Sequence, residues 1–223
     1  MPRFFVPELI SGAETVTLPA EEARHLTRVS RLVKGDAIKV FDGQGNEFLA
    51  HVDEISHDKV VVKPVSRTQA AEELSVKLTL AQALLKGKKL DGVIRDAVML
   101  GVTAVQPLLT VRGNIPASVR LHKYPFDRWK RIAISSTKQC RRAVIPEVKP
   151  AIDYERFLAC DGSALRVILV EPGPWSQTIE HVSVLRTRYK PRSATVVIGA
   201  EGGWTTGGNC SSECTWLCTV NAW

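Results

Sequence analysis

Residues 196–204 read Val-Val-Ile-Gly-Ala-Glu-Gly-Gly-Trp, an apolar β-branched run that leads directly into a glycine-rich turn. Such a run is typical of a buried strand, and open α/β sheets bind ligands at the edge where their strands end. Glycines at that edge let the backbone approach a ligand closely. The motif is not a P-loop, because no Gly-Lys-Ser/Thr follows, and it lacks the third glycine of a dinucleotide fingerprint. Its spacing therefore predicts either a ligand loop or simply a tight turn.

Strand and helix patterns alternate on the N-terminal side of this loop. The expected strands are residues 76–84, 104–109, 166–170 and 194–198, and the expected helices are residues 88–100, 126–142 and 177–186. In the first of these helices apolar residues recur at helical spacing, and Gly101 follows as its stop. This alternation predicts an α/β domain with a mostly parallel sheet covered by helices.

The first seventy residues instead read mostly as strands. Residues 37–41 and 48–52 flank Asp42-Gly43-Gln44-Gly45, and an Asp-Gly pair between two such runs indicates a hairpin. A further strand is expected at residues 59–63, and a short helix at residues 20–30. We therefore expect a small β-barrel over residues 1–70. The polar stretch 68–75 reads as a linker, so the second domain is expected to span residues 75–223.

Composition indicates a globular chain. Of its 223 residues 44% are hydrophobic, and no apolar run approaches the roughly 20 residues that span a bilayer. The N-terminus shows no secretory signal, which favours a cytoplasmic protein. The five cysteines show no framework spacing, which argues against a disulfide scaffold. The histidines and cysteines are scattered and predict no metal site.

Positive charge is concentrated in one third of the chain. The net charge is +7, and residues 75–150 hold 15 Lys/Arg against 4 Asp/Glu. Such a concentration is typical of a nucleic-acid partner, although a solvated lysine-rich surface is an equal alternative on charge alone. The expected helix at 126–142 places cations on one face at a spacing suited to phosphates, namely Arg128, Arg131, Lys138 and Arg142, with Arg141 adjoining.

Several segments, in order along the chain, resemble a single family. They are residues 1–6, 25–32, 35–36, 41–43, 82–87, 100–102, 107–108, 128–129, 139–142, 144–146 and the Gly-Ala-Glu-Gly-Gly loop at 199–203. Together they cover about residues 1–204 and resemble the RsmE-type methyltransferases of 16S ribosomal RNA, which belong to the SPOUT superfamily.

The resemblance implies a PUA-like, RNA-binding β-barrel followed by an α/β SPOUT domain with a C-terminal trefoil knot. It also implies a homodimer that methylates a uridine at ring N3, in 16S rRNA or the small ribosomal subunit, with S-adenosylmethionine as donor. The cofactor contacts that carry over are Leu169, Val170, Glu171, Ile198, Gly199, Glu201, Gly202 and Gly203. The cations expected to contact RNA are Arg3, Arg24, Arg28, Arg31, Arg128, Arg131, Lys138, Arg141 and Arg142.

The reaction calls for a fixed cation beside the uridine, because N3 must lose its proton before its lone pair can attack a methyl group. Arg112, where a strand is expected to end, is the first candidate, and Lys86, just past another strand end, is the second. The alternative for both is phosphate binding.

The chain departs from the family pattern at three places. Met99 replaces a Glu before Leu-Gly-Val, and Ala200 replaces the Pro of the glycine loop. Residues 205–223 contain no Lys or Arg and do not resemble the family's knot-closing segment. We expect an out-of-frame or prematurely ended reading there. The competing hypothesis for the whole chain is therefore an rRNA-binding module that is inactive because this segment is missing.

Overall fold

The computed structural model describes residues 1–9, 12–56, 59–111, 113, 125–170, 190–204 and, for the backbone alone, 217–220. The chain divides into two compact units. Unit 1 comprises Met1–Glu73 and Ile134–Ile145, and unit 2 comprises Leu74–Ala133 and Pro146–Trp223. The linker expected at 68–75 contains the first change of unit. The return of residues 134–145 to unit 1 has no counterpart in the sequence analysis.

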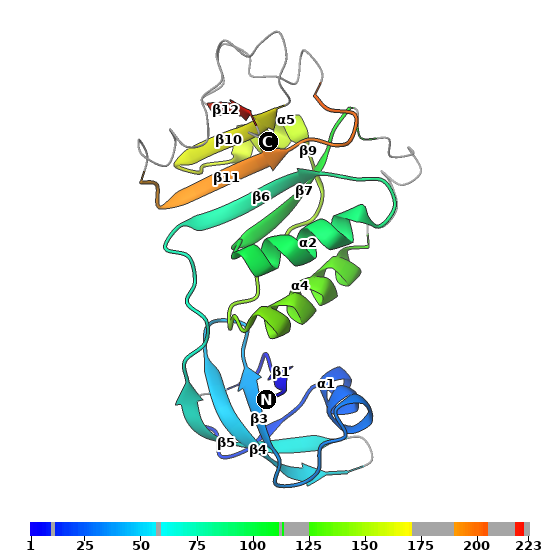
Figure 1. Cartoon of the computed structure of the whole chain (residues 1–223), viewed down its shortest axis with the longest axis vertical. Helices are drawn as coiled ribbons and strands as arrows, with labels where there is room; N and C mark the ends of the chain where they lie inside the picture. The colour runs from blue at the N-terminus through cyan, green and yellow to red at the C-terminus, as the bar shows by residue number, and fades with distance from the viewer. Residues whose placement is uncertain are drawn as a thin grey trace. The chain divides into compact units, whose positions relative to one another are not determined.

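Unit 1 is built on a five-stranded sheet in the order β1-β3-β4-β5-β2 (Figure 1). Its strands are β1 (Arg3–Phe5), β2 (Val16–Thr17), β3 (Ala37–Phe41), β4 (Glu47–Ile55) and β5 (Val60–Thr68). Strand β1 pairs with β3 in parallel, and the other pairs are antiparallel. Among the described strands the sheet is curled like half a barrel, with β1 and β2 as its edges.

The predicted hairpin is confirmed as β3 and β4. Gly43 and Gly45 adopt φ of +77° and +113°, values that L side chains rarely reach. The Asp42 carboxylate accepts the backbone N–H of Gln44 at 2.7 Å and closes the turn. A Cβ on Gly43 would fall 2.8 Å from a side-chain carbon of Ile145, so close packing requires glycine there as well.

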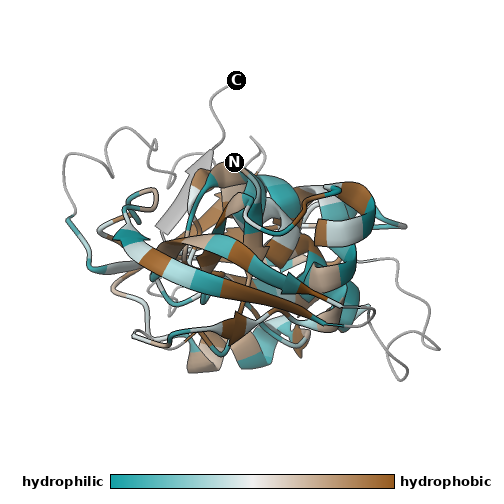
Figure 2. Cartoon of the chain, turned by 90° about the horizontal axis from the view of Figure 1, so that it is seen from below, coloured by the Kyte–Doolittle hydropathy of each residue, from teal (hydrophilic) through white to brown (hydrophobic). Residues whose placement is uncertain are grey.

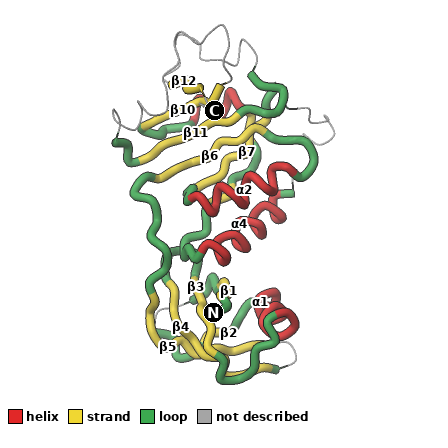
Figure 3. Tube along the Cα trace, in the orientation of Figure 1, coloured by secondary structure: helices red, strands yellow, loops and turns green. Residues whose placement is uncertain are grey.

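The short helix expected at 20–30 is present in two parts. Helix α1 (Ala20–Arg24) continues into η1 (His25–Val29), a single turn of π-helix (Figure 3). The two form one continuous helical segment, which we call the α1–η1 coil. The unit's core lies between this coil and the concave sheet, and it includes Phe4, Leu26, Ile38, Val52 and Val62. Figure 2 shows hydrophobic and hydrophilic residues mixed along the strands that face the viewer. In β3, Ile38 and Val40 are buried and Lys39 between them is partly exposed, as a sheet with one buried face requires.

A buried guanidinium joins three segments of unit 1. Arg3 donates from Nε to Glu47 Oε2 at 2.7 Å, from Nη1 to the carbonyls of Thr137 and Lys138 at 3.0 Å, and from Nη2 to the Arg142 carbonyl at 2.8 Å. The last carbonyls of a helix have no partner within the helix, so Arg3 completes the end of α4 (Phe126–Cys140). This one side chain therefore ties β1 and β4 to residues 134–145.

Glu47 balances this guanidinium from inside the sheet. Its side chain is only 1% exposed, and it also accepts hydrogen bonds from Lys39 Nζ at 2.7 Å and Thr68 Oγ1 at 2.8 Å. Burial raises the pKa of Glu47, but the hydrogen bonds from Lys39, Thr68 and Arg3 outweigh it, so the pKa lies below its ordinary value. The carboxylate is therefore held in its charged form.

Unit 2 is built on a wholly parallel sheet in the order β12-β10-β11-β6-β7-β8, with β9 also paired to β7. Its strands are β6 (Lys77–Ala83), β7 (Ala104–Leu109), β8 (Glu147–Val148), β9 (Ile152–Asp153), β10 (Leu165–Val170), β11 (Ser193–Ile198) and β12 (Leu217–Val220). The predicted parallel sheet is confirmed. The sequence did not predict β8, β9 or β12, and β12 places part of the atypical tail beside β10.

The helices of unit 2 follow the predicted rhythm. Helix α2 (Lys89–Leu100) ends at Gly101, whose φ of +99° makes the left-handed stop that was expected. Helix α5 (Tyr154–Cys160), which was not predicted, packs Phe157 onto the sheet beside Leu108, Ile168 and Val197. The helix expected at 177–186 lies outside the described residues.

Two further findings concern the described residues alone. None of their helices is long and apolar enough to cross a membrane. They also include no group of three His, Cys, Asp or Glu side chains that could hold a metal ion.

Replacing Glu47 by Gln should destabilise the chain strongly. The change keeps the size of the side chain but leaves the Arg3 guanidinium buried without its counter-charge. We expect the free energy of unfolding near pH 7 to fall by about 3 kcal/mol, because a buried charge that loses its partner is costly. Urea unfolding followed by circular dichroism measures this, with Glu14→Gln as the control, since the Glu14 side chain is 85% exposed.

The difference in stability between the native chain and Glu47→Gln should depend on pH. Since the pKa of Glu47 is lowered in the folded chain, its contribution to stability is present above its unfolded pKa and is lost as pH falls through the folded value. The native chain should therefore lose more stability on acidification than Glu47→Gln does. Equal losses in the two proteins would contradict this assignment.

Candidate functional site

The candidate site lies at the carboxyl edge of the parallel sheet in unit 2. Because the strands are parallel, the carboxyl ends of β6, β10 and β11 all lie at this edge. In the chain β6 leads to β7, which lies on one side of the β6–β11 pair. The next described strand after β11 is β12, which lies on the other side, beyond β10. This divergence makes the β6–β11 pair a topological switch point, where open α/β sheets bind their ligands.

The loop after β11 is fastened to β6 by a buried amide. Gln82, only 3% exposed, donates from Nε2 to the Gly199 carbonyl at 3.1 Å, to the Ala83 carbonyl at 3.1 Å and to the Ile198 carbonyl at 3.4 Å. One side chain therefore serves carbonyls on both strands. These bonds fix the point where the glycine loop leaves the sheet.

Trp204 closes the other end of the loop. Its indole Nε1 donates to the Leu169 carbonyl at 3.0 Å, and its ring lies 5.1 Å from the Tyr154 ring, measured between centroids. A Cβ on Gly199 would fall 3.1 Å from the indole, so the ring packs onto bare backbone there. The Gly203 N–H donates to the Ala200 carbonyl at 2.9 Å, and Gly203 has φ of +66°. The segment is thus a tight turn at the carboxyl edge of the sheet.

Glu201 ties this loop to the segment after β6. Its carboxylate pairs with Lys89 Nζ at 2.9 Å. The hydrogen bond from Lys89 lowers the pKa of Glu201 below its ordinary value, and backbone hydrogen bonds from Glu201 itself and from Lys86 lower it further. The Glu201 carboxylate is therefore occupied by groups of this chain, which favours a role in holding the two loops together.

The expected cofactor residues converge at this edge. Leu169 and Val170 end β10, and Ile198, Gly199, Glu201, Gly202 and Gly203 follow along β11 and its loop. Glu171 lies outside the described residues. No role was expected for Gln82 or Trp204, although both stand in the quoted motifs. No local pattern could show that Trp204 reaches a carbonyl 35 positions away.

Of the two expected catalytic cations, the structure describes Lys86 alone. Lys86 is exposed in the loop that follows β6, at the same edge as the glycine loop. Arg112 lies outside the described residues. Its neighbour Gly113 lies close to the end of β6, since a Cβ there would fall 3.7 Å from the Leu84 carbonyl.

The expected row of cations on α4 needs a correction at Arg142. The helix ends at Cys140 because Arg141 takes a left-handed conformation, with φ of +65°. Arg142 therefore lies outside the helix, and its side chain is 5% exposed and paired with Glu73. Lys138 is paired with Glu22 at 2.8 Å and is 16% exposed. With Arg3 buried on Glu47, three of the nine expected RNA contacts have partners inside unit 1.

The remaining cations are more accessible. Arg24, Arg28, Arg31 and Arg141 are exposed in unit 1. In unit 2 Arg131 is exposed, and Arg128 pairs with Asp91 while its side chain remains 43% exposed.

The sequence matches two family descriptions. Residues 72–207, more than half of the chain, match the family described as "RNA methyltransferase domain". Residues 18–65 match the family described as "RNA methyltransferase PUA domain". The first match contains the glycine loop together with β6, β10 and β11.

Individual relatives agree with this assignment. A Synechocystis protein named ribosomal RNA small subunit methyltransferase E is 32% identical over 89% of this chain, and its Bacillus subtilis namesake is 27% identical over 92%. This chain spans 63% of the former's length and 82% of the latter's. A solved structure of ribosomal RNA small subunit methyltransferase E from Neisseria gonorrhoeae bound to S-adenosyl methionine is 28% identical and superposes with a TM-score of 0.83. That alignment covers 100% of this chain and 89% of the solved one. The chain belongs to the RNA methyltransferase family that includes the RsmE-type enzymes of small-subunit ribosomal RNA.

Proposed function

We propose that this chain transfers a methyl group from S-adenosylmethionine to ring N3 of a uridine in 16S ribosomal RNA. The observation that carries the proposal is the fastened glycine loop at the switch point, inside the segment that matches the RNA methyltransferase domain. The names of the relatives support ribosomal RNA as substrate, and the Neisseria structure supports the donor. The choice of N3 rests on the resemblance of the motifs.

The residues at this edge suit an adenosylmethionine. At Gly199 the Trp204 ring fills the space where a side chain would stand, whereas a Cβ on Gly203 would meet no atom within 4 Å, so the backbone is open there. Leu169, Val170 and residues 198–203 would hold the cofactor mainly through backbone groups and apolar side chains. When bound, S-adenosylmethionine supplies a methyl group made electrophilic by its sulfonium.

The chain's task is then to orient the uridine and to stabilise the charge that develops on it. N3 gives up its proton to a base, its lone pair forms the new N–C bond, and the electrons of the broken C–S bond remain on sulfur. Negative charge spreads over the uracil oxygens as the proton leaves, and a fixed cation lowers the cost of that charge. We assign this role to Arg112 or Lys86, of which Lys86 is exposed at the site's edge.

RNA binding is proposed for the exposed arginines. Among the described non-glycine residues, only Arg31 and Arg141 have positive φ. A left-handed conformation costs a residue with a Cβ about 1–2 kcal/mol, and glycine avoids this cost. An arginine kept in this costly conformation favours a functional role for its side chain, here RNA binding.

We also propose that two copies of the chain associate, as the resemblance implies.

The deciding experiment is methylation of unmodified 16S rRNA and of small subunits. The RNA is incubated with the chain and S-adenosylmethionine, digested to nucleosides and analysed by mass spectrometry. We expect 3-methyluridine, and Lys86→Met should lower its rate at least about tenfold if Lys86 stabilises the transition state, while Lys88→Met should not. Methyl transfer to another atom would contradict the N3 assignment. RNA binding without transfer would support the inactive binding module instead.

Gly199→Ala should weaken cofactor binding. The added methyl group would lie 3.1 Å from the Trp204 indole, so either the ring or the loop must move. We expect the affinity for S-adenosylmethionine to fall about tenfold and the stability by about 1–2 kcal/mol, as in other overpacked sites. Calorimetric titration measures the affinity. Gly162→Ala is the matched control, because a Cβ there meets nothing within 4 Å, and an equal effect of both variants would refute the packing argument.

Arg141→Gly should make the chain more stable and a poorer RNA binder. Glycine relieves the left-handed conformation at φ +65°, so the free energy of unfolding should rise by about 0.5–1 kcal/mol. The lost cation should weaken binding to an rRNA fragment, measured by fluorescence anisotropy. Arg141→Ala removes the same charge without relieving the backbone, so it should weaken binding equally with no gain in stability. Unchanged RNA affinity in both variants would remove Arg141 from the interface.

A further inference from the structure

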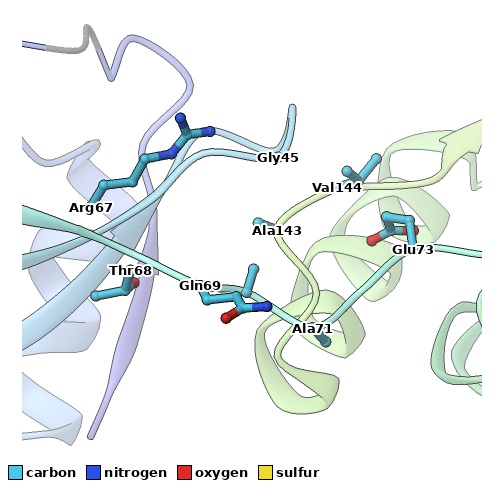
Figure 4. Close-up of a pocket in the computed structure, with 9 residues that line it drawn as sticks. Gly45, Arg67, Thr68, Gln69, Ala71, Glu73, Ala143 and Val144 are labelled. Carbon is cyan, nitrogen blue, oxygen red and sulfur yellow. The ribbon is translucent and has the colours of Figure 1, made fainter.

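Among the described residues of unit 1, two hollows differ in their chemistry. The first, of about 450 Å³, is lined mostly by small side chains and backbone, as Figure 4 shows for Gly45, Ala71 and Ala143. Its cation Arg67 donates to Asn46 Oδ1 at 2.9 Å, and its carboxylate Glu73 is bound to Arg142. Charges that are already partnered within the chain give this hollow no clear ligand.

The second hollow, of about 560 Å³, lies between the α1–η1 coil and the ends of β4 and β5. Its described lining consists of Ala20, Ala23, Arg24, Thr27, Arg28, Ser56, Lys59 and Val60. That lining includes three cations and no carboxylate. The floor is apolar and the cations are exposed, so the positive charge lies where a ligand enters.

We propose that this hollow binds a phosphodiester group of the RNA substrate through Arg24 and Arg28. The proposal rests on the proposed function, which supplies the RNA. All the lining residues fall within residues 18–65, the part that matches the PUA domain of RNA methyltransferases. The chemistry recognised is that of a phosphate oxyanion, for which the guanidinium fork is well suited.

The hydrogen bonds of the coil direct Arg24 toward this use. Its Nε donates to the Ala20 carbonyl at 3.2 Å, a bond that holds the guanidinium beside the helix without using its Nη donors. No carboxylate of the described residues pairs with Arg24 or Arg28. Of the two acids on α1, Glu22 is buried and already holds Lys138, and the exposed Glu21 forms no ion pair with either arginine.

The two arginines border one hollow because they stand four positions apart on the same helical segment. The Ser30 N–H donates to the His25 carbonyl, five residues back, so η1 is wider than an α-helical turn. Thr27 Oγ1 donates to the Ala23 carbonyl at 3.0 Å and satisfies a carbonyl within this coil. Single π-turns are rare and occur often at functional sites. Here the π-turn contains Arg28 and begins directly after Arg24.

The test compares two double variants that remove the same charge from unit 1. Arg24→Gln/Arg28→Gln removes the proposed phosphate contacts. Lys34→Gln/Lys63→Gln removes two exposed lysines that pair with Asp53 and Glu14. Binding of a single-stranded 16S rRNA fragment is measured over a range of salt concentrations. Inorganic phosphate is titrated separately into the native chain, with amide NMR shifts of residues 20–30 as the readout.

We expect the arginine variant to bind the RNA fragment about tenfold more weakly than the lysine variant. Its plot of log K against log salt should be shallower by about 1.4, the value for two lost contacts to a single strand. Inorganic phosphate should shift the coil's amides only weakly. Unchanged circular dichroism and unfolding midpoint would establish that all proteins are folded.

The outcomes separate this proposal from the proposed function. If both variants bind RNA alike, with the same slope, the hollow is not a phosphodiester site, whether or not the native chain methylates RNA. If inorganic phosphate binds tightly and the arginine variant still binds RNA normally, the hollow takes a small anion and the RNA assignment is overturned. A native chain that binds no RNA overturns both proposals.

Discussion

The structure of unit 1 depends on a charge that it cannot expose to water. Glu47 lies inside the sheet with 1% of its side chain exposed, and it is tolerated there because Arg3, Lys39 and Thr68 donate to it. Arg3 in turn uses its remaining donors on the carbonyls at the end of α4. A buried carboxylate is costly unless every oxygen is satisfied. The contacts of this pair therefore fix how β1, β4 and residues 134–145 fit together.

Unit 2 secures its glycine loop by a different means. Gln82 from β6 binds the Gly199 carbonyl, and Lys89 at the start of α2 binds the Glu201 carboxylate. Trp204 at the loop's end donates to the Leu169 carbonyl on β10. A loop with two adjacent glycines and without the family's proline would lose much conformational entropy on ordering, and these contacts offset that loss. A ligand at this edge would then meet a surface that is already shaped, which favours affinity.

Features with local causes could be read from the sequence, and features with distant partners could not. The hairpin at Gly43, the stop at Gly101 and the parallel strands all follow from short patterns. The end of α4 was missed because its left-handed residue is Arg141, where glycine is usual. The burial of Arg142 depends on Glu73, 69 positions away, and no helical period shows that. Strand β12 was missed for the same reason, since its partner is β10.

The discontinuity of unit 1 has a consequence for how the chain is made. Residues 1–73 leave the ribosome first, yet Arg3 binds the carbonyls of Thr137, Lys138 and Arg142, which are made much later. The nascent N-terminal sheet must therefore wait for about seventy more residues before its last segment arrives. Contacts of such long sequence separation slow folding and prolong the exposure of unpaired strand edges. During translation β1 therefore lacks these contacts until residues 134–145 have been made.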